Sequence, residues 1–246
     1  SEQEASVQPL ASAQAMAEKI THLRVMLRCR IVRGMNRKLY LSAECLVIFG
    51  LLPLIPVFYP IKGSLFASLW VLAILMLIVW KREHRLPLKP LIQFHHIPRD
   101  GLMLVLKRFA IAAPLMVAFI YVYDPERFFE LPRERTQLWV MIMIFYPVLS
   151  VFPQEVIYRL FFCDRYQSLF TKPKVMLVVN GLAFGWGHLL FQNWVAVSMC
   201  AAGGMLFAST WRRTKSFPLV WIEHALYGCW VFTIGLGWYF YSGAVR

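Results

Sequence analysis

The sequence predicts an all-α membrane protein, a polytopic bundle of about seven transmembrane helices preceded by an amphipathic N-terminal helix. Hydrophobic residues make up 59% of the 246 residues, and aromatic residues make up 15%. The mean hydropathy is +0.56, and the apolar residues form runs near the ~20 residues that a helix needs to cross a bilayer. These runs are continuous, so they lack the alternation of apolar and polar residues that is typical of a transmembrane β-barrel.

Residues 1–38 are predicted to be a cytoplasmic segment that contains a basic amphipathic helix. From residue 19 onward, arginines such as Arg24, Arg28 and Arg33 alternate with apolar residues such as Leu23 and Leu27. A helix with one basic and one apolar face lies on an anionic membrane surface. We therefore expect this segment to contact the lipid bilayer.

The remaining chain is expected to form one membrane domain in two parts. Residues 39–136 hold the first three membrane helices and their loops, at about Leu39–Tyr59, Ser64–Trp80 and Leu104–Tyr123. Residues 137–246 hold four more, the first running from about Gln137 past Glu155 and the others at about Val175–Phe191, Trp194–Trp211 and Phe217–Tyr241. In the sixth helix, the run Ala201-Ala202-Gly203-Gly204 favours close approach to a neighbouring helix.

The charge pattern predicts how the protein is oriented. The chain has 26 Lys and Arg residues against 13 Asp and Glu. The basic residues lie at the N-terminus and in alternate loops, which predicts a cytoplasmic N-terminus and an external C-terminus. No basic stretch forms an extended soluble face, so we do not expect a nucleic acid partner. The expected location is a membrane, specifically the bacterial inner membrane.

Two charged residues in the fourth helix are the first candidates for a functional site. Glu155 and Arg159 are four residues apart, so they share a helix face with the acid N-terminal to the base, the favourable order for an ion pair. Gln154 precedes the acid and offers both a donor and an acceptor. Ionisable groups inside apolar segments are costly, and they indicate a functional site by default.

Two histidines on other helices complete the candidate site. His188 lies on the fifth helix, and His224 lies on the seventh beside a further acid, Glu223. At about 1.5 Å per residue, Glu155, His224 and His188 lie about 15, 13 and 21 Å from the nearest cytoplasmic charge on their helices. Because helix tilt absorbs such differences, we expect the three groups to meet in one plane.

Four motifs occur in order in this part of the chain: Gln154-Glu-Val-Ile-Tyr-Arg159, Phe184-Gly-Trp-Gly-His188, the helix of Gly203 and Gly204 that ends in Trp211, and Ile222-Glu-His-Ala-Leu-Tyr-Gly228. They resemble the motifs of the CPBP family, the CAAX-protease and bacteriocin-processing group of intramembrane endopeptidases, which is similar to the type II CAAX prenyl endopeptidase. The resemblance covers about residues 137–241. It implies an endopeptidase whose substrate is a polypeptide in or at the membrane, prenylated or with a leader sequence. The chain departs from the family motifs at Gln154, where the family has Glu, and at Gly228, where it has Asn or Asp.

The resemblance also implies roles for the candidate residues. Glu155 is expected to take a proton from a water molecule held with His188, while His224 stabilises the oxyanion and Arg159 orients the acid. Glu223 is a possible supporting acid. This glutamic mechanism needs no metal cofactor. The alternative is a zinc enzyme in which Glu155, His188 and His224 bind the metal.

Two other classes of function remain open at this level. Because Gln154 replaces a family glutamate, the same pocket suits a catalytically inactive membrane binding or immunity protein. A transporter is the third alternative, but the sequence shows no internal repeat of the kind that transporters are built from.

Overall fold

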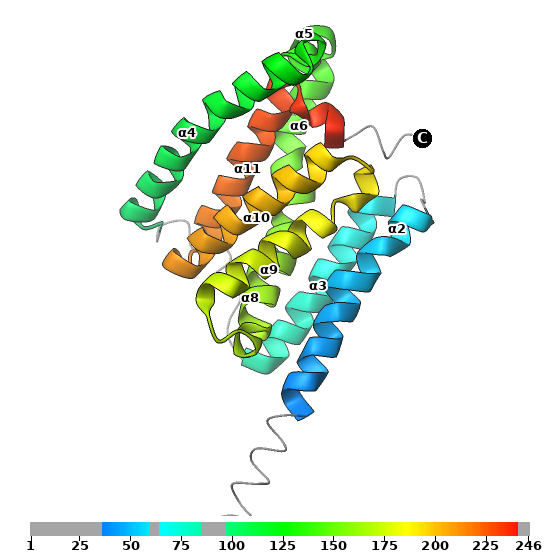
Figure 1. Cartoon of the computed structure of the whole chain (residues 1–246), viewed down its shortest axis with the longest axis vertical. Helices are drawn as coiled ribbons and strands as arrows, with labels where there is room; N and C mark the ends of the chain where they lie inside the picture. The colour runs from blue at the N-terminus through cyan, green and yellow to red at the C-terminus, as the bar shows by residue number, and fades with distance from the viewer. Residues whose placement is uncertain (1–35, 60–63, 85–96, 241–246) are drawn as a thin grey trace, which may run out of the picture. The chain divides into compact units, whose positions relative to one another are not determined.

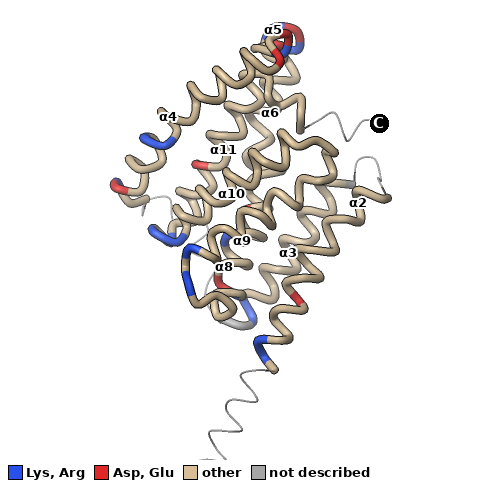
Figure 2. Tube along the Cα trace, in the orientation of Figure 1, with Lys and Arg blue, Asp and Glu red and all other residues tan. Residues whose placement is uncertain are grey.

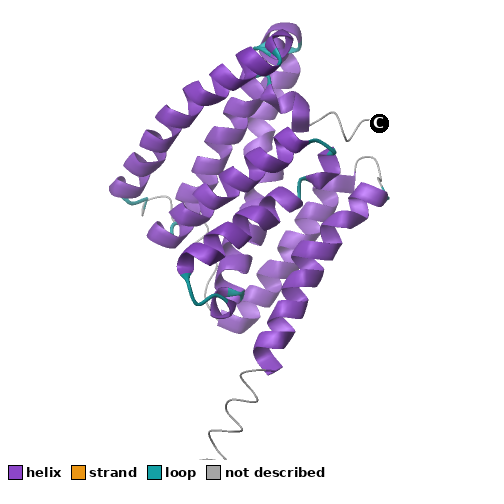
Figure 3. Cartoon of the chain, viewed as in Figure 1, coloured by secondary structure: helices purple, strands orange, loops and turns teal. Residues whose placement is uncertain are grey.

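The structure is a computed structural model that describes residues 36–59, 64–84 and 97–240. Throughout these residues the regular structure is helical and no strand occurs (Figure 3). The predicted all-α class is therefore confirmed. Most of the predicted N-terminal amphipathic helix lies outside the described residues.

Seven helices in the described part of the chain are long and apolar enough to cross a membrane, which confirms the predicted number and an integral membrane protein. They span Asn36–Phe58, Leu65–Arg82, Arg99–Tyr123, Thr136–Arg165, Pro173–Phe191, Trp194–Thr214 and Phe217–Ile234. The chain divides into two compact units, Ser1–Glu44 and Cys45–Arg246. In the first unit, described residues 36–44 are helical. The division into membrane helices up to residue 136 and a catalytic core after it stays a prediction.

The second unit contains the elements that form the candidate site (Figure 1). Its N-terminal part consists of η1 (Leu46–Leu51), η2 (Leu52–Leu54), α2 (Ile55–Phe58), α3 (Ser64–His84), α4 (Arg99–Tyr123), η5 (Pro125–Arg127) and α5 (Glu130–Glu134). The fourth span is built from α6 (Thr136–Tyr146), η6 (Pro147–Val151), α7 (Phe152–Glu155), η7 (Val156–Phe161) and α8 (Phe162–Arg165), which η8 (Gln167–Leu169) follows. The last elements are α9 (Pro173–Trp186), η9 (Leu189–Phe191), α10 (Trp194–Thr214), α11 (Phe217–Ile234) and η10 (Leu236–Phe240).

The fourth span is continuous, but prolines interrupt its hydrogen bonding. Pro153 has no N–H to donate to the carbonyl of Leu149, and the indole of Trp70 on α3 donates to that carbonyl at 3.0 Å instead. The indole of Trp221 on α11 donates to the carbonyl of Pro147 at 2.7 Å. η6 and η7 are π-helical turns, a form that is frequent at functional sites. Helix α3 thus satisfies a carbonyl that Pro153 leaves open, and α11 adds a second donor to the Pro147 carbonyl, which also accepts from the N–H of Phe152.

Helices α9 and α10 form the most extensive helix pair in the unit. A Cβ on Gly181 would lie 2.7 Å from the carbonyl oxygen of Ala201, and a Cβ on Gly204 would lie 2.9 Å from Gly181 Cα. These glycines let the two backbones approach closely, as the small-residue run predicted. The resulting pair supports the turn after α9 that carries His188.

Helix α11 lies against α4, α6, α7 and α10. It begins at Phe217, after Ser216 accepts a hydrogen bond from the N–H of Leu219 at 3.4 Å, and Pro218 occupies its first turn. It ends at Ile234 and is followed by Gly235, whose φ of 104° few other residues adopt. This surrounded position buries both Glu223 and His224.

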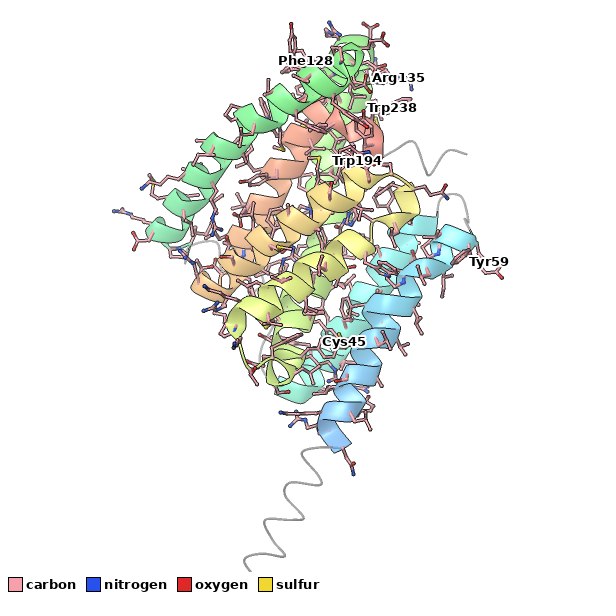
Figure 4. All side chains as sticks on the ribbon, in the orientation of Figure 1. Cys45, Tyr59, Phe128, Arg135, Trp194 and Trp238 are labelled. Atoms are coloured by element: carbon pink, nitrogen blue, oxygen red, sulfur yellow. The ribbon has the colours of Figure 1, made fainter. Side chains whose placement is uncertain are left out.

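Charged residues concentrate toward the helix ends, and α5 carries a cluster of both signs (Figure 2). At the same end of the bundle lie Arg135 and Trp238 (Figure 4). Both line a cavity of about 100 Å³, together with Glu130, Leu131, Glu134, Leu138, Ile142, Phe232, Gly235 and Gly237. The predicted site residues do not line this cavity, so the candidate site is a separate feature.

Candidate active site

Glu155 occupies the last position of α7 and is fully buried. Its Oε1 lies 2.8 Å from Nδ1 of His224. Its Oε2 lies 3.3 Å from Nε of Arg159, one helical turn further along the same span. The structure therefore brings three of the predicted site residues together, and both carboxylate oxygens face a nitrogen.

Arg159 is also fully buried, and a polar side chain on α9 accepts a hydrogen bond from it. Its Nη1 donates to Oδ1 of Asn180 at 2.8 Å. The Asn180 amide in turn donates to the carbonyl of Tyr158 at 2.8 Å. The guanidinium carbon lies 5.0 Å from the ring centre of Phe184 and 5.5 Å from that of Phe207, within the range of cation–π contacts. These contacts fix the guanidinium, and through it the orientation of the Glu155 carboxylate.

Asn180 is a site residue that the sequence analysis did not identify. It is fully buried, four residues before Phe184 and eight before His188. A spacing of four is about one helical turn, so Asn180 and Phe184 share a face of α9, whereas His188 lies beyond the end of that helix. A polar amide inside an apolar span, eight positions before a candidate histidine, is the signal that could have identified it.

The imidazole of His224 is packed against two aromatic rings. Its ring stacks on Phe207 at 4.7 Å between centres with 20° between planes, and it meets the Phe184 ring edge to face at 5.4 Å between centres. Because a carboxylate only accepts hydrogen bonds, the Nδ1 contact with Glu155 favours the neutral tautomer with its proton on Nδ1. Nε2 is then unprotonated, and it lies 3.5 Å from the hydroxyl of Tyr146.

His188 lies in the turn after α9, although the sequence predicted that it would be part of the helix. Its Nδ1 lies 2.7 Å from the carbonyl oxygen of Phe184, which can only accept a hydrogen bond, so Nε2 is again the unprotonated nitrogen. The Phe184 ring lies 4.7 Å from the His188 ring and 5.4 Å from the His224 ring. Within the described residues no hydrogen bond joins His188 to Glu155. The ring of Phe184, which contacts both imidazoles, is the link between His188 and the cluster of Glu155, Arg159 and His224.

Gln154 and Glu223 make their contacts outside the cluster of Glu155, Arg159 and His224. The amide of Gln154 donates to the hydroxyl of Ser150 on its own span at 2.8 Å. Glu223 is fully buried, and its Oε1 lies 3.7 Å from Nη1 of Arg108 on α4. Neither oxygen of Glu223 has a hydrogen-bond partner among the described residues.

The zinc alternative requires three protein ligands that surround one point. No group of three or more His, Cys, Asp and Glu side chains in residues 36–59, 64–84 and 97–240 is placed to hold a metal ion. Both oxygens of Glu155 face His224 and Arg159. In the observed arrangement these residues do not fit a zinc ion.

Comparison with known proteins yields one family. Residues 136–241 match the family model described as Rce1-like, type II CAAX prenyl endopeptidase Rce1-like. No curated protein and no solved structure gives a significant match to the chain. The matched range contains Glu155, Arg159, His188 and His224.

Proposed function

We infer from the match over residues 136–241 that the chain belongs to the Rce1-like type II CAAX prenyl endopeptidase family, as its motifs predicted, and we propose that it hydrolyses peptide bonds within the membrane. The residues that we assign to the reaction are Glu155, His224 and His188, with Arg159 and Asn180 as positioning residues. Each lies in a membrane span of the matched region.

The observation that carries this proposal is the 2.8 Å contact between Glu155 Oε1 and His224 Nδ1. A buried carboxylate at Nδ1 holds an imidazole in the tautomer whose Nε2 accepts a proton. It also stabilises the imidazolium that forms when the proton is taken up. This geometry favours His224 Nε2 as the general base, with Glu155 as its partner rather than as the base itself.

The reaction then proceeds in two steps. His224 Nε2 takes a proton from water as the water oxygen bonds to the peptide carbonyl carbon, which gives a tetrahedral oxyanion. The carbon–nitrogen bond then breaks, and the proton on Nε2 passes to the departing amine. Water is the only co-reactant, and the products are a carboxylic acid and an amine.

His188 is suited to binding the water or the departing amine. Its Nδ1 donates to the Phe184 carbonyl, which leaves Nε2 as an acceptor. The ring of Phe184 lies against both imidazoles. Gln154, whose amide is bound to Ser150, has no role in proton transfer in this proposal.

We propose that the reaction needs no metal ion, since the paired carboxylate and the two imidazoles account for the proton transfers. Cleavage that persists in EDTA, after the protein has been purified without added metal, is the expected result. Loss of cleavage in EDTA and its recovery with Zn²⁺ would contradict this mechanism and support the zinc alternative.

The substrate that we propose is a polypeptide in or at the membrane that is prenylated or has a leader sequence. The support is the family match together with the depth of the site, which lies inside helices able to cross a bilayer. We propose that the protein lies in the bacterial inner membrane. The pattern of basic loops supports a cytoplasmic N-terminus and an external C-terminus.

A second candidate function is that of a binding or immunity protein that holds such a polypeptide without cutting it. The observation that favours it is Gln154, which stands where the family motif has a carboxylate and binds Ser150 rather than the histidines. An inactive relative would retain the Glu155–Arg159 pair for its contribution to packing.

Incubation of the protein in liposomes with a library of membrane peptides distinguishes the two functions. New peptide termini detected by mass spectrometry, and lost in the variant His224→Ala, are the result expected of the endopeptidase. Peptides retained on the liposomes without new termini would contradict the endopeptidase and support the binding protein. Thermal unfolding in detergent micelles verifies that the variant is folded.

A further inference from the structure

The space beside His224 that a side chain at position 228 would fill is occupied by Tyr146. Gly228 lies one helical turn after His224 on α11. A Cβ on Gly228 would overlap the ring and the hydroxyl oxygen of Tyr146. The absent side chain at 228 is therefore the reason that Tyr146 can reach this position.

Tyr146 is held in place by its own helix and by a second aromatic ring. It is the last residue of α6, and the π-helical turn η6 begins at the next residue, Pro147. Its ring packs edge to face against Phe232 at 5.2 Å between centres, two turns beyond His224 on α11. This packing directs the hydroxyl toward the imidazole.

The hydroxyl of Tyr146 lies 3.5 Å from Nε2 of His224. Nδ1 of this ring faces Glu155, so Nε2 carries no proton and the hydroxyl is the donor of the pair. A separation of 3.5 Å is at the long end of hydrogen bonding, and a reacting oxygen beside Nε2 would be within reach of both groups. Hydrogen bonds of active sites are often long before substrate binds.

We propose that the Tyr146 hydroxyl is the donor that stabilises the oxyanion at His224, in place of the polar side chain that position 228 lacks. The donor is supplied from α6 instead of from α11. The proposal rests on the proposed endopeptidase function. It explains how the site can work although the fourth motif ends in glycine.

The first test is Tyr146→Phe, which retains the ring packing and removes only the hydroxyl. Removal of one oxyanion donor lowers kcat by about 10²–10³-fold. We expect kcat to fall by about 100-fold, with KM within about twofold and an unchanged thermal unfolding midpoint. A tyrosine that only fills space would give full activity in Tyr146→Phe, and that result would overturn the proposal.

The second test exchanges the two positions. Gly228→Asn alone must displace Tyr146, so its activity is expected to fall at least as far as that of Tyr146→Phe. Tyr146→Ala/Gly228→Asn frees the space and provides an amide donor from α11, so its activity is expected to exceed that of Tyr146→Ala alone by about tenfold or more. A double variant no more active than Tyr146→Ala would contradict the exchange of donors.

A spectroscopic measurement separates failure of this proposal from failure of the proposed function. If the wild-type protein cleaves no peptide, the proposed endopeptidase function is wrong. The contact between the Tyr146 hydroxyl and His224 Nε2 is still tested by the ¹⁵N resonances of labelled histidine. Replacement of the Tyr146 hydroxyl is expected to shift the Nε2 resonance of His224 by several parts per million and to leave that of His188 in place. An unchanged His224 resonance would overturn the contact itself.

Discussion

Glu155 and Glu223 are both fully buried carboxylates in membrane spans, yet their surroundings differ. Glu155 faces His224 at 2.8 Å and Arg159 at 3.3 Å. Glu223 faces one cation, Arg108, at 3.7 Å and has no hydrogen-bond partner in the described part of the chain. Burial of an acid is therefore a weak indicator of a site, whereas an acid that fixes an imidazole is a strong one.

The two arginines explain this difference. Arg159 is completely buried and shares the span of Glu155, and Asn180 and two aromatic rings hold it. The Arg108 side chain is 21% exposed. Its donors are directed to Ser209 at 3.2 Å and to Thr210 at 3.0 Å on α10. Arg108 thus joins α4 to α10, and its pairing with Glu223 is loose.

The largest expected effect is on activity, in the matched pair Glu155→Gln and Glu223→Gln. Glutamine at 155 retains size but cannot stabilise an imidazolium, so we expect cleavage to fall by about 10³-fold or more. Glutamine at 223 changes a group that does not touch His224, and we expect activity within about threefold of wild type. Peptide cleavage in liposomes measures both. Equal losses in the two variants would remove the distinction between the two acids.

The next effect is on stability, in Arg159→Leu and Arg108→Leu. Loss of Arg159 leaves the Glu155 carboxylate buried beside an apolar side chain, and removal of one partner of a buried pair costs about 3–5 kcal/mol. Arg108 is partly exposed and lies 3.7 Å from Glu223, so the pair is weaker, and its removal is expected to cost less, about 1–3 kcal/mol, although it leaves the buried Glu223 without a cation. Unfolding free energies in mixed detergent micelles provide the comparison. A larger loss at Arg108 than at Arg159 would reverse our interpretation of the two pairs.

A smaller difference is expected between the residues that support each arginine. Asn180→Ala leaves a donor of Arg159 and the carbonyl of Tyr158 unpaired in the interior, at a cost of about 1–3 kcal/mol. Ser209→Ala removes one of two hydroxyl acceptors of Arg108 and leaves Thr210 in place, so a cost under about 1 kcal/mol is expected. The same unfolding measurement applies. If both variants unfold alike, Asn180 does not hold the buried pair.

The smallest effect on stability is expected at Glu223 itself. Because the ion pair of Glu223 with Arg108 is long and glutamine retains the size of the side chain, Glu223→Gln is expected to change the unfolding free energy by less than about 1 kcal/mol in either direction. A loss of several kcal/mol would show that the Arg108–Glu223 pair is a major support of α11.

Much of the architecture and part of the site could be predicted from the sequence. Apolar runs of sufficient length predicted seven spans, because a helix that satisfies its own backbone is the structure such runs adopt in lipid. The spacing of Glu155 and Arg159 predicted a shared helix face, and they form an ion pair. Tyr146 could not have been identified, because its role depends on the missing side chain at Gly228, 82 positions along the chain.

By itself the sequence determined the helical class, the seven spans, the family resemblance of residues 136–241 and the polar residues inside the apolar helices, since each depends on composition or on spacing along one helix. Only the tertiary structure decided which nitrogen of His224 meets Glu155, that Asn180 holds Arg159, that His188 lies in a turn, and that Gly228 admits Tyr146. Hydrogen bonds and close contacts between helices depend on the rotation and depth of each helix. The rotation and depth of each helix are set by packing between distant segments, and the spacing of residues along the sequence does not predict them.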